Sequence, residues 1–562
     1  MHPVLRRVFH NRDLFTVEDL DHGLSNLIPP ARLAGMKAAV EVLVQALETR
    51  QRILIIGDFD VDGATATTLA LLGLRGMGAA EVAYLVPNRF EYGYGLSPEI
   101  AEVAVRQDPG LVITVDNGIS SIKGVQLLKE RDVGVIVTDH HLPGKQLPQA
   151  DAIVNPNQPG CDFPSKALAG VGVMFYLLLG LRAGLRAENW FAEHEIEEPN
   201  LAAYLDLVAL GTVADLVPLD RNNRILVAQG VARIQSGACR QGIAKLLEVA
   251  GRKYRRAVTS DLGFVVGPRL NAAGRLDDIS TGIECLLAED PAAAAELAAM
   301  LQGINRQRRE IEQQMQQQAV AALKSLDDLG ESGQAEGVCL FDESWHQGVT
   351  GLVASRIKER TERPVVAFAP GGNSELKGSA RSIPQLHIRD ALAAIDAGNP
   401  GLIQRFGGHA MAAGLSIARD SYPRFREAFR QEVAALLQSE NLESVLLTDG
   451  EIGAEDYNIA LAETLRGASP WGQGFPAPLF DGCFEVLSQR IVGGQHLKLT
   501  LRPEGRREAL DGIAFRFCAA GDRAPEFSRV HAVYQLDVNE FRGRRSVQLL
   551  IEHLEPLEEE RL

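Results

Sequence analysis

Three carboxylates at alternate positions follow an apolar run near the start of the chain. Ile53–Ile56 leads directly into the segment GDFDVDG, whose acidic residues are Asp58, Asp60 and Asp62, and a helical pattern follows. Carboxylates this close repel one another unless cations hold them, and Mg²⁺ and Mn²⁺ prefer oxygen ligands of this kind. A calcium loop or an acidic turn that caps the helix would use the same residue types. An EF-hand does not fit, because it needs an acidic residue at the twelfth loop position.

Two later apolar runs end in residues of the same kind. Leu111–Val115 precedes Asp116, and Val133–Val137 precedes a triplet Asp-His-His that contains His140 and His141. Alone, this triplet is equally explained by a helix cap followed by core histidines. Metal-type ligands at three consecutive strand ends favour a metal site, and imidazole beside carboxylates favours Mn²⁺, with Mg²⁺ at the oxygen-rich position.

Asp215 is the fourth candidate ligand. It closes the segment GTVAD after the apolar stretch Tyr204–Leu210. Five or six ligands in one crevice are enough for two ions, and metal pairs about 3.5–4 Å apart serve phosphoester hydrolysis. No serine or cysteine nucleophile is required for that chemistry. The ligand set therefore predicts a two-metal phosphoesterase.

These residues need elements that bring them together. Through about residue 290, short runs rich in Val and Ile alternate with helical stretches, which predicts βαβ units and a doubly wound parallel sheet buried on both faces. The runs are Ile53–Ile56, Val82–Val86, Leu111–Val115 and Val133–Val137. Open α/β sheets bind ligands at the carboxyl ends of their strands. Ala167–Leu181, the longest apolar run, is shorter than the roughly 20 residues that span a bilayer and predicts a buried helix.

Three further zones follow. Residues 290–329 are rich in Ala and Gln and predict one long connecting helix. A smaller α/β zone comes next, with strands at Gly337–Phe341 and Val365–Phe368, a helix at Gly348–Arg360 between them, and glycine-rich loops near residues 407–408. The last zone alternates strands and turns, which predicts a small β-barrel. Its expected strands are Phe484–Val492, His496–Leu501, Ala509–Phe517, His531–Val538 and Ser546–Glu552.

The composition is that of a folded chain with several domains. Its 562 residues predict three to four domains at about 150 residues each, and 46% hydrophobic residues exclude collagen-like and wholly disordered classes. The six cysteines form no CxxC pair, and the first residues lack the apolar core of a secretory signal. We therefore expect a reducing cytoplasm.

The net charge of −16 argues against a surface coated with phosphate-binding charge, so any groove for a polyanion must be local. Residues 490–545 offer such a place, because they contain eleven Lys or Arg against seven Asp or Glu, together with Phe515 and Phe517. Basic residues among aromatics suit single-stranded nucleic acid, whose bases stack and whose phosphates pair with arginine. A solvated charged face is the alternative interpretation.

The order of GDFDVDG, VDNG, TDHH and GTVAD resembles the DHH phosphoesterase superfamily, and nearly the whole chain is similar to the bacterial single-strand-specific exonucleases of that superfamily. The resemblance implies two bound Mn²⁺ or Mg²⁺ ions. One ion would be held by Asp62, Asp116, His140 and Asp215. The other would be held by Asp58, Asp60 and a bridging Asp116, while His141 would face the scissile phosphate.

The smaller α/β zone resembles the accessory DHHA1 domain, and the resemblance implies that it binds substrate. The implied residues are Ser379, Arg381, Gly407, Gly408 and His409. Glycine-rich loops can cradle phosphate with backbone N–H groups, and Arg381 offers a bidentate fork. For Gly407-Gly408 an ordinary turn is the alternative. Arg269 and Arg275 resemble the stretch that lines the nucleic-acid path, and a helix cap with incidental arginines is the other interpretation.

The resemblance also implies the domain order. The fold class expected is α/β, and the terminal barrel resembles an oligonucleotide-binding (OB) fold, which the shorter two-lobed relatives lack. We expect a helical lead-in at 1–45, a DHH catalytic domain at 46–289, a connecting helix at 290–329, a DHHA1 domain at 330–440 and an OB domain at 441–562. A strand-binding barrel implies a polymer substrate.

The function implied is a metal-dependent exonuclease that degrades single-stranded DNA from its 5′ end to 5′-mononucleotides, in bacterial recombination and mismatch repair. Single-strand-binding protein and repair helicases are the implied partners, and the location is the cytoplasm at the nucleoid. One alternative is a hydrolase of short oligoribonucleotides or cyclic dinucleotides. Another is an inactive strand-binding scaffold, whose expected signature is loss of metal ligands that this sequence retains.

Overall fold

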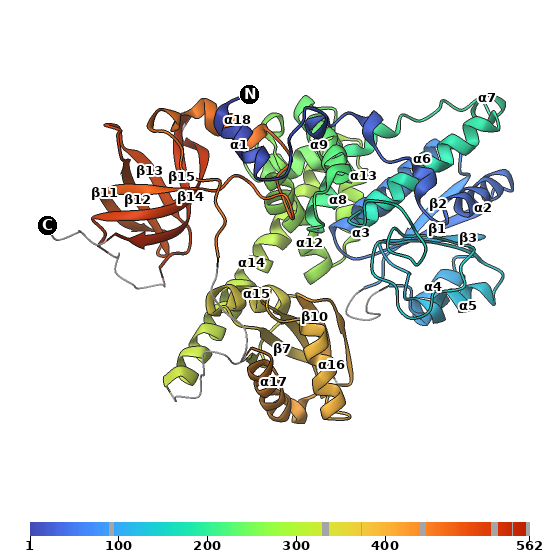
Figure 1. Ribbon diagram of the computed structural model, residues 1–562. Helices are drawn as coiled ribbons and strands as arrows, with labels where there is room; N and C mark the ends of the chain where they lie inside the picture. Colours follow the sequence, from blue (N-terminus) through green and yellow to red (C-terminus); the bar gives the residue numbers. More distant parts are fainter. Residues whose placement is uncertain are drawn as a thin grey trace. The chain divides into compact units, whose positions relative to one another are not determined.

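The computed structural model describes residues 1–88, 95–328, 337–372, 374–437, 445–518, 526–541 and 543–557. They form two compact units, whose helices and strands are labelled in Figure 1. The first unit contains Met1–Asn271, Ile279–Ala299 and Leu446–Leu562. The second contains Ala272–Asp278 and Met300–Val445.

The first unit is built on a five-stranded parallel sheet, as the apolar runs predict. Its strands are β1 (Arg52–Gly57), β2 (Glu81–Leu85), β3 (Leu111–Val115), β4 (Gly134–Thr138) and β5 (Ala152–Val154). Their order is β2-β1-β3-β4-β5, and every pair is parallel. The chain therefore switches sides of the sheet between β1 and β3, and such a switch point opens a crevice at the strands' carboxyl ends.

Helices cover both faces of this sheet, which confirms the doubly wound arrangement. Helices α4 (Pro98–Val105) and α5 (Ile122–Lys129) pack on the face that contains Leu54, Val112 and Val135. Helices α3 (Val61–Gly76) and α6 (Gly170–Ala187) lie on the other side (Figure 1). By length and composition α6 could cross a membrane, but 67% of it is buried inside the protein, as in the buried helix predicted there.

The N-terminal segment is less helical than expected. Only α1 (Pro3–His10) and α2 (Met36–Glu48) are α-helical, and short 3₁₀ turns lie between them, the last of which begins at Pro30. Helix α1 and the residues after it contact the segment that precedes the barrel. The Arg12 guanidinium donates to the Asp449 carboxylate at 2.7 and 3.0 Å, and the Phe9 ring stacks on Trp471.

The first unit ends in a closed barrel, as predicted. Its strands are β11 (Phe480–Val492), β12 (His496–Pro503), β13 (Leu510–Ala514), β14 (Arg529–Phe541) and β15 (Arg544–Pro556), and they close in the order β11-β12-β13-β15-β14. Helix α18 (Ile459–Gly467) packs against β14 and β15. The third strand is shorter than expected, so Phe515 and Phe517 lie beyond its end.

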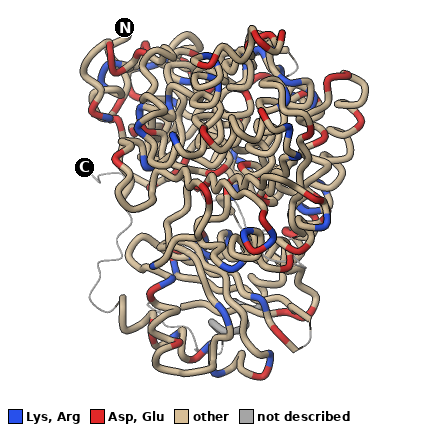
Figure 2. Tube along the Cα trace, turned by 90° about the vertical axis from the view of Figure 1, so that its right-hand side faces the viewer, with Lys and Arg blue, Asp and Glu red and all other residues tan. Residues whose placement is uncertain are grey.

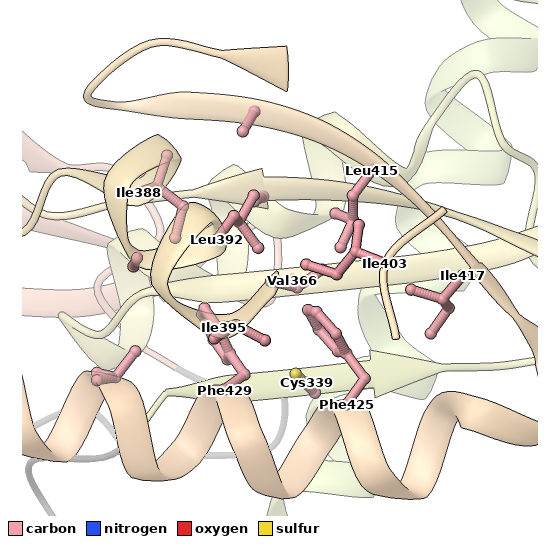
Figure 3. Packing of buried hydrophobic residues seen from close by; sticks show 14 of the residues in the cluster. Cys339, Val366, Ile388, Leu392, Ile395, Ile403, Leu415, Ile417, Phe425 and Phe429 are labelled. Atoms are coloured by element: carbon pink, nitrogen blue, oxygen red, sulfur yellow. The ribbon is translucent and has the colours of Figure 1, made fainter. Parts of the chain in front are cut away.

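The second unit is a smaller α/β fold, also as predicted. The long helix α14 (Pro291–Asp328) leads into it from the first unit. The sheet order is β6 (Val338–Phe341), β7 (Val365–Gly372), β8 (Glu375–Arg381), β10 (Ala412–Ala418) and β9 (Arg405–Gly408). Its helices are α15 (Thr350–Thr361), α16 (Ile388–Gly398) and α17 (Tyr422–Leu437). Phe425 and Phe429 of α17 pack into the core with Val366 and Leu415 (Figure 3).

Candidate metal centre

The loop after β1 supplies the first candidate ligands. Asp58 is buried, and Asp60 caps the N-terminus of α3 by accepting the Gly63 N–H at 3.1 Å. The helix-capping interpretation is therefore correct for Asp60. It does not compete with metal binding, because Asp58, Asp60 and Asp116 place ligand atoms within 4.8 Å of one another.

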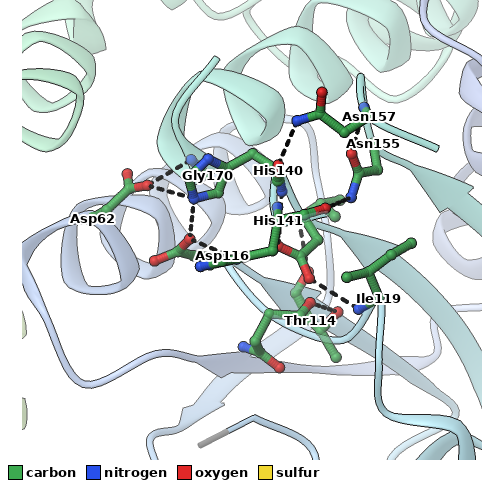
Figure 4. Close-up of polar contacts among 12 residues, drawn as sticks. Asp62, Thr114, Asp116, Ile119, His140, His141, Asn155, Asn157 and Gly170 are labelled. Carbon is green, nitrogen blue, oxygen red and sulfur yellow. Dashed lines mark hydrogen bonds and ion pairs between the residues drawn. The ribbon is translucent and has the colours of Figure 1, made fainter. Parts of the chain in front are cut away.

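Asp62 lies in the first turn of α3 and is held from a distant part of the chain. Its two oxygens accept the N–H groups of Gly170 and Val171, at the start of α6, at 2.5 and 2.9 Å (Figure 4). Burial and the nearby Asp60 carboxylate nevertheless raise the pKa of Asp62 to about 7. The two backbone N–H donors stabilise the Asp62 anion and lower its pKa, but burial and the Asp60 charge raise that pKa by more.

Asp116, His140 and Asp215 lie together at the carboxyl edge of the sheet. Asp116 follows β3 in the left-handed backbone region at a φ of 62°. The His140 Nε2 atom lies 3.1 Å from Asp116, 3.5 Å from Asp215 and 4.0 Å from Asp62. Asp215 is the C-cap of helix α8 (Leu205–Ala214), which packs against α3 and α6.

Repulsion among the buried carboxylates of this cluster favours the binding of cations. Burial, followed by repulsion from neighbouring aspartates, raises the pKa of both Asp116 and Asp215. Each carboxylate therefore disfavours ionisation of the others, and a divalent cation would relieve that repulsion. Among the described residues, the groups placed to share an ion are Asp58–Asp60–Asp116, Asp62–His140–Asp215 and Asp116–His140–His141. The donor set of oxygens and imidazole fits Mn²⁺ or Mg²⁺.

Asp139 positions His141, a role that the sequence interpretation missed. Its Oδ1 lies 2.8 Å from His141 Nδ1, and its other oxygen accepts the Ile119 N–H at 2.9 Å. Burial would raise the pKa of Asp139, but the hydrogen bond and charge of His141 outweigh it and lower that pKa. Burial would likewise lower the pKa of His141, and Asp139 reverses that shift. The pair orients the imidazole.

Two asparagines fix the backbone that carries these histidines. The Asn155 side chain donates to the His141 carbonyl at 3.0 Å, and Asn157 donates to the His140 carbonyl at 2.6 Å (Figure 4). Both follow β5, the next strand of the sheet. Asparagines after a short strand are the only sequence signal that could have identified them.

Four of the residues predicted to bind substrate lie in strands and not in the loops that were expected. Ser379 and Arg381 belong to β8, which pairs with β7 and β10, so their backbone is part of a ladder and does not form a loop that cradles phosphate. Gly407 and Gly408 belong to the edge strand β9, which corrects the expected loop or turn. His409 follows that strand and donates its N–H to Ala412.

Arg381 keeps the properties of an anion-binding residue. Burial lowers the pKa of its guanidinium, and its Nη1 donates to the Ala380 carbonyl at 2.8 Å. Within the described part of the chain, no carboxylate forms an ion pair with it. Arg269 and Arg275 lie in helix α12 (Gly267–Leu276), where Arg269 is buried and donates to Val265 O. Arg275 belongs to the second unit.

The barrel carries less open positive charge than its sequence suggests. Arg490, Arg507, Arg516 and Arg544 are exposed and form no ion pair among the described residues. The other described cations of residues 490–545 pair locally, as Lys498–Asp511, Arg502–Glu485, Arg506–Glu508, Arg529–Glu504 and Arg545–Glu463. Phe515 and Phe517 are 60% and 41% exposed on either side of Arg516.

Comparison with known proteins assigns the class. Residues 52–212 match the DHH family N-terminal domain, residues 334–435 the DHHA1 domain and residues 448–553 the RecJ OB domain. The fold and the clustered aspartates and histidines are thus those of a DHH-family protein.

Relatives that match over nearly the whole chain identify the particular family within this class. The chain is 54% identical over 554 residues to the single-stranded-DNA-specific exonuclease RecJ of Dickeya dadantii, covering 99% of this chain and 96% of the relative. It is 50% identical over 555 residues to the Escherichia coli RecJ, with the same coverage. The chain belongs to the RecJ family. A crystal structure of Thermus thermophilus RecJ in complex with Mn²⁺ matches with a TM-score of 0.78 and 30% identity, over 99% of this chain and 76% of that one.

Proposed function

We propose that this chain is a metal-dependent exonuclease that hydrolyses single-stranded DNA from the 5′ end to 5′-mononucleotides. One observation carries the proposal: aspartates and histidines from four separate loops converge at the switch point of the sheet, in a chain similar over its full length to single-stranded-DNA-specific exonucleases. The bound Mn²⁺ or Mg²⁺ ions would supply Lewis-acid stabilisation of charge at the attacked phosphate.

The side chains have separate tasks in this proposal. Asp58, Asp60 and a bridging Asp116 would hold one ion, and Asp62, His140 and Asp215 would complete the site of the other. His141, oriented by Asp139 at 2.8 Å, would contact the scissile phosphate. The N–H donors of α6 would keep Asp62 in place whether or not cations are bound.

Residues outside the metal centre would bind the single-stranded DNA. Arg269, Arg275, Ser379, Arg381, Gly407, Gly408 and His409 are the substrate residues that we propose. The absence of a carboxylate beside Arg381 among the described residues supports phosphate binding there. The exposed Phe515 and Phe517 support stacking of bases on the barrel.

The sequence boundaries at 45, 289, 329 and 440 remain our proposed domain limits. Single-strand-binding protein and repair helicases are the proposed partners, in recombination and mismatch repair at the nucleoid of a bacterial cytoplasm. The resemblance supports these roles.

The test uses single-stranded DNA blocked at either the 5′ or the 3′ end, with Mn²⁺, Mg²⁺ or EDTA. A block at the 5′ end and EDTA should each abolish mononucleotide release, and a 3′ block should not. Asp116→Ala should be inactive. Asp132→Ala is the matched control, because Asp132 is exposed and has a similar φ of 58° without lying in the cluster.

A second comparison separates the alternative hydrolase. Release of nucleotides from a dinucleotide but not from a long strand would indicate an enzyme of short oligonucleotides. Activity of Asp116→Ala at the wild-type level would refute the metal centre itself.

A further inference from the structure

The first unit contains a cavity of about 580 Å³ whose lining includes chain neighbours of the candidate ligand Asp215. Its lining begins at Val213 and Leu216, on either side of Asp215, and extends to Trp471 and to Leu536 of β14. The volume is within the range of cavities that bind small organic groups. The metal ligands and substrate residues proposed above do not use this space.

Two apolar side chains at this cavity are exposed. Leu216 is 64% exposed, and its φ of 60° lies in the left-handed region, which costs a non-glycine residue about 1–2 kcal/mol. Phe264 is 75% exposed and lies in the π-helical turn η6 (Leu262–Val266). Single π-helical turns and strained residues are frequent at functional sites. Both side chains are therefore placed to contact a ligand.

Two arginines at the cavity form ion pairs with long separations. The Arg252 Nε lies 3.5 Å from Asp261, and the Arg466 guanidinium lies 3.8 Å from Asp261 and 3.7 Å from Asp537. These separations are longer than hydrogen bonds, so a phosphate can compete for both guanidinium groups.

Arg252 also begins a basic segment, RKYRR, at residues 252–256. Lys253 and Arg256 form ion pairs with Glu540 of β14, which ties the segment to the barrel. The Arg255 guanidinium lies over the Tyr254 ring at 5.4 Å, and Arg255 is exposed and has no ion pair within the described residues. In a chain of net charge −16, this segment is a local concentration of positive charge that begins at the cavity, because Arg252 belongs to the cavity lining. Figure 2 shows that acidic and basic positions are interspersed along the trace.

We propose that the cavity and the basic segment form a track for the single strand between the metal centre and the barrel. An unpaired base would contact Leu216 and Phe264, and Arg255 would contact the strand's phosphates. A flat base with an apolar face fits this lining, and its phosphate complements the adjoining cations, which an uncharged apolar peptide would not. The inference rests on the proposed function and assigns a binding site to it.

The test measures binding of two exposed-residue variants to an oligothymidylate of about 20 nucleotides, longer than the site size of one OB fold. Binding is followed by fluorescence anisotropy in EDTA, which prevents cleavage. Phe264→Ala should weaken binding about 5- to 150-fold, the range for one base–aromatic contact. Phe15→Ala is its control, since Phe15 is 65% exposed elsewhere in the unit.

Arg255→Gln should reduce the slope of log affinity against log salt by about 0.7, the value for one phosphate contact on a single strand. Arg106→Gln is its control, because Arg106 is exposed at the end of α4 and away from the cavity lining. Thermal unfolding checks that all four variants are folded.

The outcomes separate this inference from the proposed function. Long-strand binding that weakens in Phe264→Ala and Arg255→Gln but not in the controls supports the track. If both variants bind the strand with wild-type affinity, the inference is overturned. The same result is expected if a protein partner, and not DNA, occupies the cavity. A wild-type protein that fails to hydrolyse any DNA strand with Mn²⁺ overturns the proposed function, whatever the variants bind.

Discussion

Gly170→Ala tests the geometry of the metal centre without removing a ligand. Gly170 begins α6 and donates its N–H to Asp62. A Cβ atom at this position would lie 2.5 Å from the Cβ of Asp116, about 1 Å inside the optimum separation of roughly 3.5–4.0 Å between carbon atoms. Rotation of the Asp116 side chain cannot relieve this contact, because its Cβ is fixed by the backbone. The variant must therefore move Asp116 away from α6 by about 1 Å.

A displacement of this size should cost about 100-fold in kcat/KM and weaken Mn²⁺ activation. The assay is mononucleotide release from labelled single-stranded DNA over a Mn²⁺ titration, with the unfolding midpoint measured in parallel. Gly172→Ala is the matched control in the same helix, because its Cβ would meet only the Leu168 side chain, whose flexible end is the nearest part at 3.2 Å. Wild-type kcat/KM in Gly170→Ala would refute the argument, as would an equal loss in Gly172→Ala.

Three further predictions concern stability and strand binding. Asp449→Asn should lower the free energy of unfolding by about 3 kcal/mol, because it leaves Arg12, whose side chain is only 9% exposed, without a counter-ion; an unchanged urea midpoint would contradict this. Burial raises the pKa of Cys285 to about 12, so the folded thiol keeps a proton that the unfolded thiol loses near pH 9. Between pH 9 and 11 the free energy of unfolding of the wild-type protein should thus fall with pH more steeply than that of Cys285→Ala, by about 1.4 kcal/mol per pH unit. Equal pH slopes of the two proteins in urea titrations would contradict this prediction. Joint replacement by Gln of the four barrel arginines that form no ion pair among the described residues should lower the slope of log affinity against log salt, measured by anisotropy, by about 3, and an unchanged slope would contradict their contact with phosphates.

The ligands at strand ends could be predicted because their signal is local. An apolar run followed by Asp or His specifies both a buried strand and the residue at its carboxyl end, as at Leu111–Val115 and Asp116. The parallel order then places β1 and β3 side by side and brings their loops together. Asp215 follows a helix, and only the packing of α8 against α3 brings it to the same place.

The support of these ligands could not be predicted, since it comes from distant parts of the chain. The N–H groups that hold Asp62 belong to residues 108 and 109 positions further along. Gly407 and Gly408 were wrongly expected in a loop or turn, because glycine is common in turns, whereas they belong to the edge strand β9. In β8 a Cβ at Gly378 would lie 2.5 Å from the Phe368 ring, so glycine is needed there for packing. A sequence pattern indicates that glycine is conformationally free, but it does not show which neighbouring side chain occupies the position where a Cβ would lie.

Charge distribution explains how an acidic protein can select single strands. Part of the acidity lies in a buried cluster whose aspartates raise one another's pKa, where divalent cations would reverse the local sign. On the barrel, local carboxylates neutralise most described cations, whereas Phe515 and Phe517 remain exposed. Phosphate charge is common to single and double strands, but a base can stack on an aromatic ring only when it is unpaired and unstacked from its neighbours. A barrel surface with few unpaired cations among its described residues and with exposed rings therefore favours the single strand, because a duplex could use the cations of that surface but not its rings.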